Sequence, residues 1–205
     1  MGKFIHNRSV VYNYQMPRTK TIPDDVLLEA ALDIVHRTGP ATLSFATLAD
    51  AVGLASSTIV QRFGSKADLL RATLLHAWDR LDADTAAAAA AASPDAAGVV
   101  DMLVALSGSY EANDFADQLM VLREDLRDPV LRARGEAWIA TLCEQIEQHL
   151  ADALDIPDGT EGLGELIVTH WQGTLTVWGF TRPGPLPDVV RRSLDTLLRR
   201  VVQQR

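Results

Sequence analysis

Cysteine is nearly absent from this 205-residue sequence, since Cys143 is the only one. A single thiol excludes an intramolecular disulfide framework and a cysteine-rich zinc site, and it is typical of a protein of the reducing cytoplasm. We expect Cys143 to be a small buried apolar residue rather than a redox sensor. The sequence therefore predicts a cytoplasmic protein with no metal site and no cofactor.

Long apolar runs are also lacking. The stretch from Gly98 to Ser107 is interrupted by Asp101 and falls well short of the roughly 20 residues that cross a bilayer. Residues 1–15 have neither an apolar core nor a small-residue cleavage site, and Met16 offers a second possible start. We interpret residues 1–15 as a disordered arm, a tag or a misassigned start, and expect no membrane partner.

Positive charge is scarce, because the formal net charge is −8. Residues 1–15 carry two basic side chains, residues 16–80 seven basic and seven acidic ones, and residues 81–205 ten basic and twenty acidic ones. The acidity therefore belongs to the C-terminal part. A neutral N-terminal part can still bind phosphate if its positive charges lie on one face, since fields are screened within about 8 Å.

Apolar residues follow the 3.6-residue period of a helix along the chain, and turn residues separate the periodic segments. No convincing alternation typical of a strand and no internal repeat is found, so we predict an all-α fold. Residues 16–70 are predicted to form a three-helix helix-turn-helix domain, joined by a long helix to a larger ligand-binding and dimerisation domain, residues 71–205. The expected helices span about 24–38, 45–52, 56–63, 65–92, 96–112, 116–127, 129–155, 161–181 and 187–204.

A helix-turn-helix motif is the strongest functional signal. Counted from Phe45, Ala49 is the fifth residue, Gly53 the ninth and Ile59 the fifteenth. The small Ala49 lets the second helix approach, Gly53 supplies the backbone angles of a tight turn, and Ile59 packs the two helices at a steep angle. This geometry presents the later helix to the major groove of DNA.

The setting of the motif is also specific, because a helix precedes it and an aromatic-Gly-Ser-Lys turn leads into a long helix. From about Leu27 to Leu75 the chain resembles the tetracycline-repressor (TetR) family of transcriptional regulators. The matching residues are Leu28-Glu29-Ala30-Ala31-Leu32, Gly39, Ser44, Leu48-Ala49, Ala51-Val52-Gly53, Ser57-Thr58-Ile59 and Phe63-Gly64-Ser65-Lys66. The resemblance implies a repressor that a small molecule releases from its operator.

Candidate DNA contacts follow from the motif. Gln61 can pair with adenine and Arg62 with guanine or phosphate, while Lys66 in the first turn of the long helix suits a phosphate. The family usually has a DNA-contacting tyrosine where this chain has Val60, which can instead touch a thymine methyl group. The alternative interpretation is a solvated polar face. The full set of candidates is Ser44, Ser56, Ser57, Thr58, Val60, Gln61, Arg62 and Lys66.

The resemblance implies dimerisation through the last two helices and a ligand site between helices of the second domain. The apolar stripes of residues 161–181 and 187–204 favour a four-helix interface between two subunits, with packing inside one subunit as the alternative. We expect an apolar or aromatic effector and a palindromic or near-palindromic operator in duplex DNA. The candidate effector contacts are Met102, Leu106, Tyr110, Met120, Arg123, Trp138, His170 and Trp171.

These effector candidates have a structural alternative, because aromatic and methionine side chains at helical spacing are more often ordinary core. A hydrogen-bonded core histidine is likewise the more common role for His170 than metal ligation. An enzyme is the rival function, but the paired Glu-x-x-His, His-Glu-x-x-His, Gly-x-Ser-x-Gly and Gly-rich phosphate-binding motifs are all missing from the sequence. A DNA-binding structural protein without an effector would not need so large a second domain.

Overall fold

The computed structural model describes residues 22–108, 114–151 and 159–203, and all regular structure in these ranges is helical, as the sequence predicts. The N-terminal helices are α1 (Asp24–Thr38), a short 3₁₀ helix η1 (Pro40–Thr42), α2 (Phe45–Val52) and α3 (Ser56–Phe63). The long helix α4 (Lys66–Ala91) follows. The remaining helices are α5 (Ala96–Leu106), α6 (Asp114–Arg127), α7 (Pro129–Ala151), α8 (Leu163–Thr181) and α9 (Leu186–Gln203).

Local signals fix the ends of the first helices, and the predicted bounds of α1, α2 and α3 are confirmed. The Ser44 hydroxyl accepts a hydrogen bond from the Thr47 N–H at 3.1 Å, and the Thr47 hydroxyl accepts one from the Ser44 N–H at 2.9 Å. This reciprocal capping box starts α2. Gly53 ends it in the left-handed region, at φ 69°. Ser65 caps α4 by accepting a hydrogen bond from the Asp68 N–H at 3.1 Å.

The helix predicted over 96–112 ends earlier than expected, at Leu106. Ser107 donates its hydroxyl to the Leu103 carbonyl, and Gly108 turns the chain at φ 61°, so the prediction was wrong for these two residues. The expected positions 109–112 lie outside the described residues, as do residues 1–15. The 3₁₀ turn η1 was not expected; it follows Gly39, which has φ 80°.

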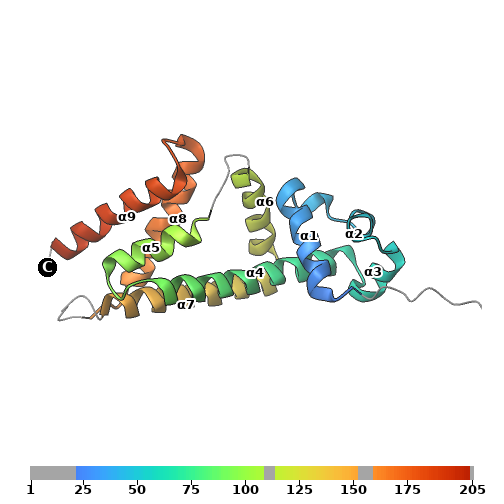
Figure 1. Ribbon diagram of the computed structural model, residues 1–205, viewed down its shortest axis with the longest axis horizontal. Helices are drawn as coiled ribbons and strands as arrows, with labels where there is room; N and C mark the ends of the chain where they lie inside the picture. Colours follow the sequence, from blue (N-terminus) through green and yellow to red (C-terminus); the bar gives the residue numbers. More distant parts are fainter. Residues whose placement is uncertain (1–21, 109–113, 152–158, 204–205) are drawn as a thin grey trace, which may run out of the picture.

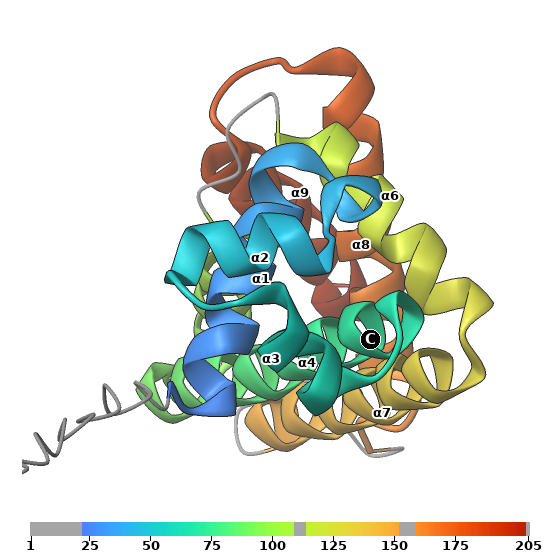
Figure 2. The ribbon, with the colours of Figure 1, turned by 90° about the vertical axis from the view of Figure 1, so that its right-hand side faces the viewer.

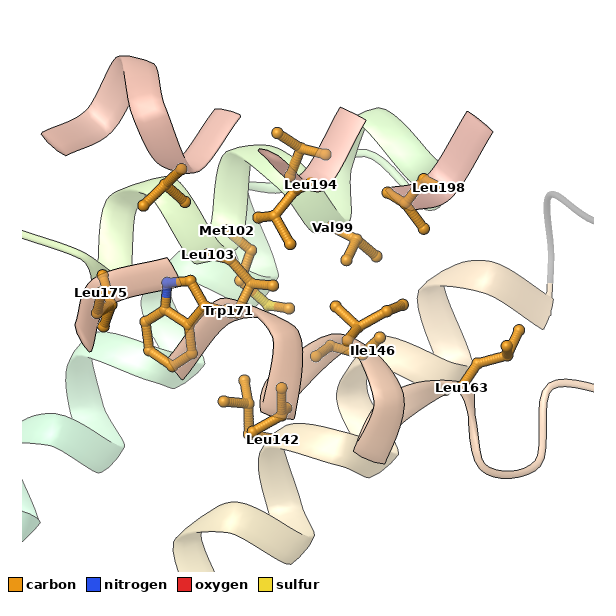
Figure 3. Close-up of a cluster of buried hydrophobic side chains, with 14 of the residues drawn as sticks. Val99, Met102, Leu103, Leu142, Ile146, Leu163, Trp171, Leu175, Leu194 and Leu198 are labelled. Atoms are coloured by element: carbon orange, nitrogen blue, oxygen red, sulfur yellow. The ribbon is translucent and has the colours of Figure 1, made fainter. Parts of the chain in front are cut away.

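The long helix α4 runs through both ends of an elongated molecule (Figure 1). At one end, α1, α2 and α3 pack on its N-terminal part, and viewed from this end they lie in front of the other helices (Figure 2). At the other end, α5, α7, α8 and α9 enclose a larger core, in which Trp171 lies among Met102, Leu103 and Leu142 (Figure 3).

Trp78 on α4 packs against both hydrophobic clusters. Its ring centroid lies 5.8 Å from that of Trp138, which lies 6.4 Å from that of Trp171. The indole N–H of Trp138 bonds the Thr85 hydroxyl at 3.0 Å. The row of three indoles therefore connects the N-terminal end of the molecule to the interior of the C-terminal core.

Candidate DNA-binding surface and effector region

The outward face of α3 carries four of the predicted DNA contacts. Ile59 is fully buried and anchors the helix, so residues on the opposite side point to solvent. Ser56, Ser57 and Gln61 are exposed, and Val60 is 40% exposed although it is apolar. An exposed stripe of short hydroxyls, one amide and one methyl-bearing side chain can donate to base edges and phosphates and contact a thymine methyl.

Arg62 and Thr58 lie on a different side of α3 and are partly buried. The Arg62 Nη1 donates to the Ile22 carbonyl and lies 3.0 Å from the Asp24 Oδ1. This guanidinium thus ties α3 to the start of α1, a contact that the sequence did not predict. The ion pair offsets the negative charge of Asp24 beside α3.

Ser44 and Lys66 lie at the starts of α2 and α4, and both are engaged within the chain. The Ser44 hydroxyl is committed to the capping box of α2. Lys66 is exposed and donates its Nζ to the Ala41 carbonyl at 2.9 Å, so α4 is tied to the turn before α2. An exposed ammonium on one backbone oxygen keeps two further N–H donors for a phosphate.

The predicted effector contacts do not come together in one place. Met102, Trp138 and Trp171 are buried in the C-terminal core, and Leu106 packs against that core. Met120 is 45% exposed on α6. The remaining described candidates lie at two cavities, Arg123 beside α4 and His170 between α8 and α9, and Tyr110 lies outside the described residues.

The apolar stripe expected to form a subunit interface is largely used inside the subunit. On α8, Leu163, Ile167 and Trp178 are buried, and on α9 Val190 and Leu194 are fully buried. Packing within one subunit therefore accounts for most of the apolar face of α9. Only part of each stripe remains for another molecule, and the interface between two subunits stays a prediction.

A second stripe on α8 stays in solvent. Its members recur at alternating spacings of four and three residues, which places them on one line along the helix. The Val177 side chain is 59% exposed and that of Phe180 86% exposed, and a Cβ built at Gly173 meets nothing within 4 Å. We call this line the outer seam of α8. It consists of Leu166, His170, Gly173, Val177 and Phe180.

A cavity of about 450 Å³ adjoins the outer seam, between α8 and α9. The His170 Nε2 lies 2.8 Å from the Ser193 Oγ, and Thr174 bonds the same hydroxyl at 3.1 Å. This chain of side-chain bonds holds the two helices together. It gives His170 a satisfied structural partner on a half-exposed surface.

The junction between the two ends is polar. On α6, Asp125 accepts a hydrogen bond from the Trp78 indole N–H at 3.2 Å, and burial raises the pKa of this carboxyl to about 6. Glu29 of α1 pairs with both His76 and Arg80 of α4. The hydrogen bond from His76 is the main reason that the pKa of Glu29 is lowered.

Over the described ranges, no helix is long and apolar enough to cross a membrane. Within the same ranges, no three His, Cys, Asp or Glu side chains gather in a way that could hold a metal ion.

Comparison with known proteins identifies the N-terminal end. Residues 27–73 match the family model of the bacterial regulatory proteins, tetR family. A comparison with curated proteins finds no match. The fold is similar to those of several solved transcriptional regulators. One from Rhodococcus sp. Rha1 is 16% identical with a TM-score of 0.69, covering 87% of this chain and 97% of that one.

A second solved structure, from Saccharomonospora viridis in complex with choline, is 20% identical with a TM-score of 0.67 and covers 84% and 93% of the two chains. A TetR regulator from Legionella pneumophila is 18% identical with a TM-score of 0.65, covering 88% and 99%. These similarities extend over both ends of the molecule, so the shared fold includes the second domain.

Proposed function

We propose that this chain, whose residues 27–73 match the model of the tetR family of bacterial regulatory proteins, is a cytoplasmic, sequence-specific transcriptional repressor of that family, released from its operator by a small molecule. One observation carries the proposal. The helix-turn-helix that matches the family model holds α3 by the buried Ile59 and leaves Ser57 and Gln61 exposed on its outer face. A reading helix needs this combination of a fixed backbone and free polar side chains.

We assign the reading of DNA bases to Gln61 and Val60. We assign contacts with the DNA backbone to Ser56, Ser57 and Lys66. An amide can pair bidentately with adenine, and a valine methyl suits thymine. The hydroxyls and the ammonium position the helix without reading sequence.

We also assign contacts with the DNA backbone to Ser44 and Thr58. Each would use the hydrogen-bonding capacity that remains to its hydroxyl. Arg62 contributes through the guanidinium nitrogens other than Nη1, the one that bonds the start of α1. An arginine has five donors in a planar fork, so one side chain can brace α1 and also meet a phosphate or guanine.

The proposed regulator is a homodimer through α8 and α9. Leu166, Val177 and Phe180 on the outer seam of α8 expose large apolar surface that water would hydrate unfavourably in a monomer. A helix pair from each subunit would make a four-helix interface, in which Gly173 allows close approach. Two reading helices related by a two-fold axis then require a palindromic or near-palindromic site.

The effector site is proposed in the second domain. A regulator of similar fold was solved in complex with choline, so this architecture can hold a small molecule. In this chain, Met102, Leu106, Trp138 and Trp171 would supply apolar contacts if the core opens. Tyr110, Met120, Arg123 and His170 remain candidates from the sequence alone. An apolar or aromatic effector fits these side chains.

The proposal is tested by selecting duplexes from the region upstream of the chain's own gene and measuring affinity by fluorescence anisotropy. Gln61→Ala should weaken binding to the selected site by about 1 to 3 kcal/mol and relax preference at one base pair. Lys66→Ala should weaken all duplexes alike and flatten the salt dependence.

Gln172→Ala, an exposed glutamine of α8, is the matched control and should change neither quantity. If the wild-type chain binds the upstream region no better than random duplex, the proposed function is wrong.

A further inference from the structure

We call α1, α2 and α3 together the DNA-reading end. A cavity of about 410 Å³ lies where the long helix α4 leaves this end. Its walls are the N-terminal half of α4, the C-terminal end of α6 and the turn into α7. Leu70, Leu74 and Leu131 line its apolar side, and the last two are almost completely buried. This volume falls within the range of small-molecule sites, which begins at about 300 Å³.

Three guanidinium groups line the polar side of the cavity, from Arg71, Arg123 and Arg127. The lining holds two carboxylates, Glu124 and Asp128, so its formal charge is +1. Glu124 pairs with Arg123 at 2.6 Å, and Asp128 accepts the Arg71 Nε at 2.6 Å. Arg127 is exposed and forms no ion pair with any residue that the structure describes.

We propose that this junction cavity binds a monocarboxylate with an apolar body, such as a medium-chain or aromatic acid, and that this ligand controls operator binding. The control of operator binding rests on the proposed function, whereas the binding of the acid does not. A carboxylate matches the surplus positive charge and the fork geometry of arginine, while the leucine side takes the apolar body. A cation would meet three guanidinium groups, and inorganic phosphate would leave the leucines unused.

The cavity is connected to the DNA-reading end by a chain of hydrogen bonds. Ser65, the cap of α4, donates its hydroxyl to Asp68 at 2.6 Å, and the Arg71 Nη1 lies 3.1 Å from the other oxygen of Asp68. Arg71 also bonds Asp128, whose carboxylate caps α7 through the Val130 N–H at 2.9 Å. The hydrogen bond from Arg71 is the main reason that the pKa of Asp128 is lowered.

Arg71 is therefore the shared member of the caps of α4 and α7. A carboxylate in the cavity competes with Asp68 and Asp128 for this guanidinium. It loosens the first turn of α4, whose Lys66 holds the turn before α2 through the Ala41 carbonyl and thereby helps to position the helix-turn-helix. Ligand binding and the position of α3 are then coupled through Arg71. This side chain bonds Asp68 and Asp128 in the ligand-free chain and the carboxylate in the ligand-bound chain.

Calorimetry on the full chain tests the binding, with octanoate and benzoate as probes and with octanamide and benzamide as neutral probes of the same shape. We expect the acids to bind and the amides to bind at least tenfold more weakly. Arg127→Gln and the double variant Arg123→Gln, Arg127→Gln should weaken acid binding about tenfold or more. Arg132→Gln, an exposed arginine of α7 outside the cavity, is the control and should bind as the wild type does.

Failure of either acid to bind at millimolar concentration, or equal binding of acid and amide, overturns the proposal. Equal loss in Arg132→Gln and Arg127→Gln also overturns it, because the loss would then be general electrostatics. Arg127 makes no ion pair with described residues, so its substitution tests the site without breaking an ion pair of the fold.

A separate titration with operator DNA distinguishes binding of the acid from its control of operator binding. With acid bound, operator affinity should fall 5- to 150-fold, and operator should weaken acid binding by the same factor. If the acid binds but operator affinity is unchanged, the proposed control of operator binding by the acid is wrong, and the proposed DNA-binding function stands. Absence of operator binding in the ligand-free chain overturns the proposed function, and acid binding is then judged on calorimetry alone.

Discussion

The DNA-reading end and the C-terminal core of this molecule are stabilised in different ways. In the reading end, α2 and α3 have eight residues each, well below the length at which an isolated helix is stable in water. They depend on the Ser44 capping box and on packing around Ile59. In the C-terminal core, long helices cross closely and bury three tryptophans, Trp138, Trp171 and Trp178.

This difference indicates where each end is vulnerable. Losing a cap at the reading end removes about 1 kcal/mol and loosens one short helix, whereas a misfit at a helix crossing strains the whole core. Trp78 is shared by both clusters, so the two ends are not independent. Variants in each region therefore test whether the two ends lose stability for different reasons.

The largest effect is expected at the crossing of α7 and α8. A Cβ at Gly164 would lie 2.5 Å from the Cys143 carbonyl oxygen, and the backbone must shift to accept it. Gly164→Ala should therefore lower the free energy of unfolding by about 3 kcal/mol. Thermal or urea unfolding measures this. Thr176→Ala at an exposed position of the same helix should stay within about 0.5 kcal/mol, and equal stability of the two variants would contradict close packing at the crossing.

The outer seam of α8 gives the second effect, on association rather than folding. Val177→Glu places a charge in the middle of the proposed interface and should weaken dimerisation at least tenfold, because the carboxylate would be desolvated without a partner. Analytical ultracentrifugation measures the dimer dissociation constant. Gln172→Glu adds the same charge on another side of α8 and should leave it unchanged. A Val177→Glu chain that dimerises like the wild type would place the interface elsewhere.

The capping box of α2 gives the third effect, confined to the reading end. Ser44→Ala removes both the cap of the Thr47 N–H and the hydroxyl contact between the two side chains, at a cost of about 1.5 kcal/mol. Hydrogen exchange should show faster opening of α2 than in the wild type and unchanged protection in α8. Equal loss of protection in both helices would show that the two ends unfold as one unit.

Asp125 at the junction gives the smallest effect, and one that depends on pH. Its folded pKa of about 6 lies above the ordinary 3.8, so the folded chain holds a proton that the unfolded chain releases. Stability therefore falls as the pH rises from about 4 to 6 and is then level. Asp125→Asn should be more stable at pH 7 by about 1 kcal/mol, allowing for solvent screening, with no gain at pH 4.

Asp84→Asn, an exposed site on α4, is the control for Asp125→Asn and should leave the free energy of unfolding at pH 7 within about 0.5 kcal/mol of the wild type. Loss of stability at pH 7 in Asp125→Asn would mean that the charged form of this carboxyl is favoured by the fold.

The reading end could be predicted from the sequence because its signals are local. Ser44 and Gly53 mark the two ends of α2, Gly39 marks the end of α1 and Gly64 the end of α3, all through bonds within a few residues. The contact from Arg62 to Asp24 could not be predicted, because the two residues are 38 positions apart and nothing in the pattern pairs them.

The second domain was predictable as helices but not as a site. Its apolar periodicity is the same whether a stripe faces its own core or another subunit, so the buried role of Leu163 and Val190 is visible only in the packed structure. The junction cavity likewise depends on where α6 and the start of α7 meet α4. Of its arginines, only Arg123 was among the predicted effector contacts, since charged residues on separate helices carry no shared spacing.

The central claim is that two symmetric copies of α3 read one duplex. Its most direct test is a titration of the selected operator against a duplex of equal length in which one half-site is scrambled. We expect two chains per intact operator and an affinity loss of at least about 100-fold for the scrambled duplex, since one copy of α3 loses its base contacts. Equal affinity for the two duplexes, with one chain bound to each, would contradict it.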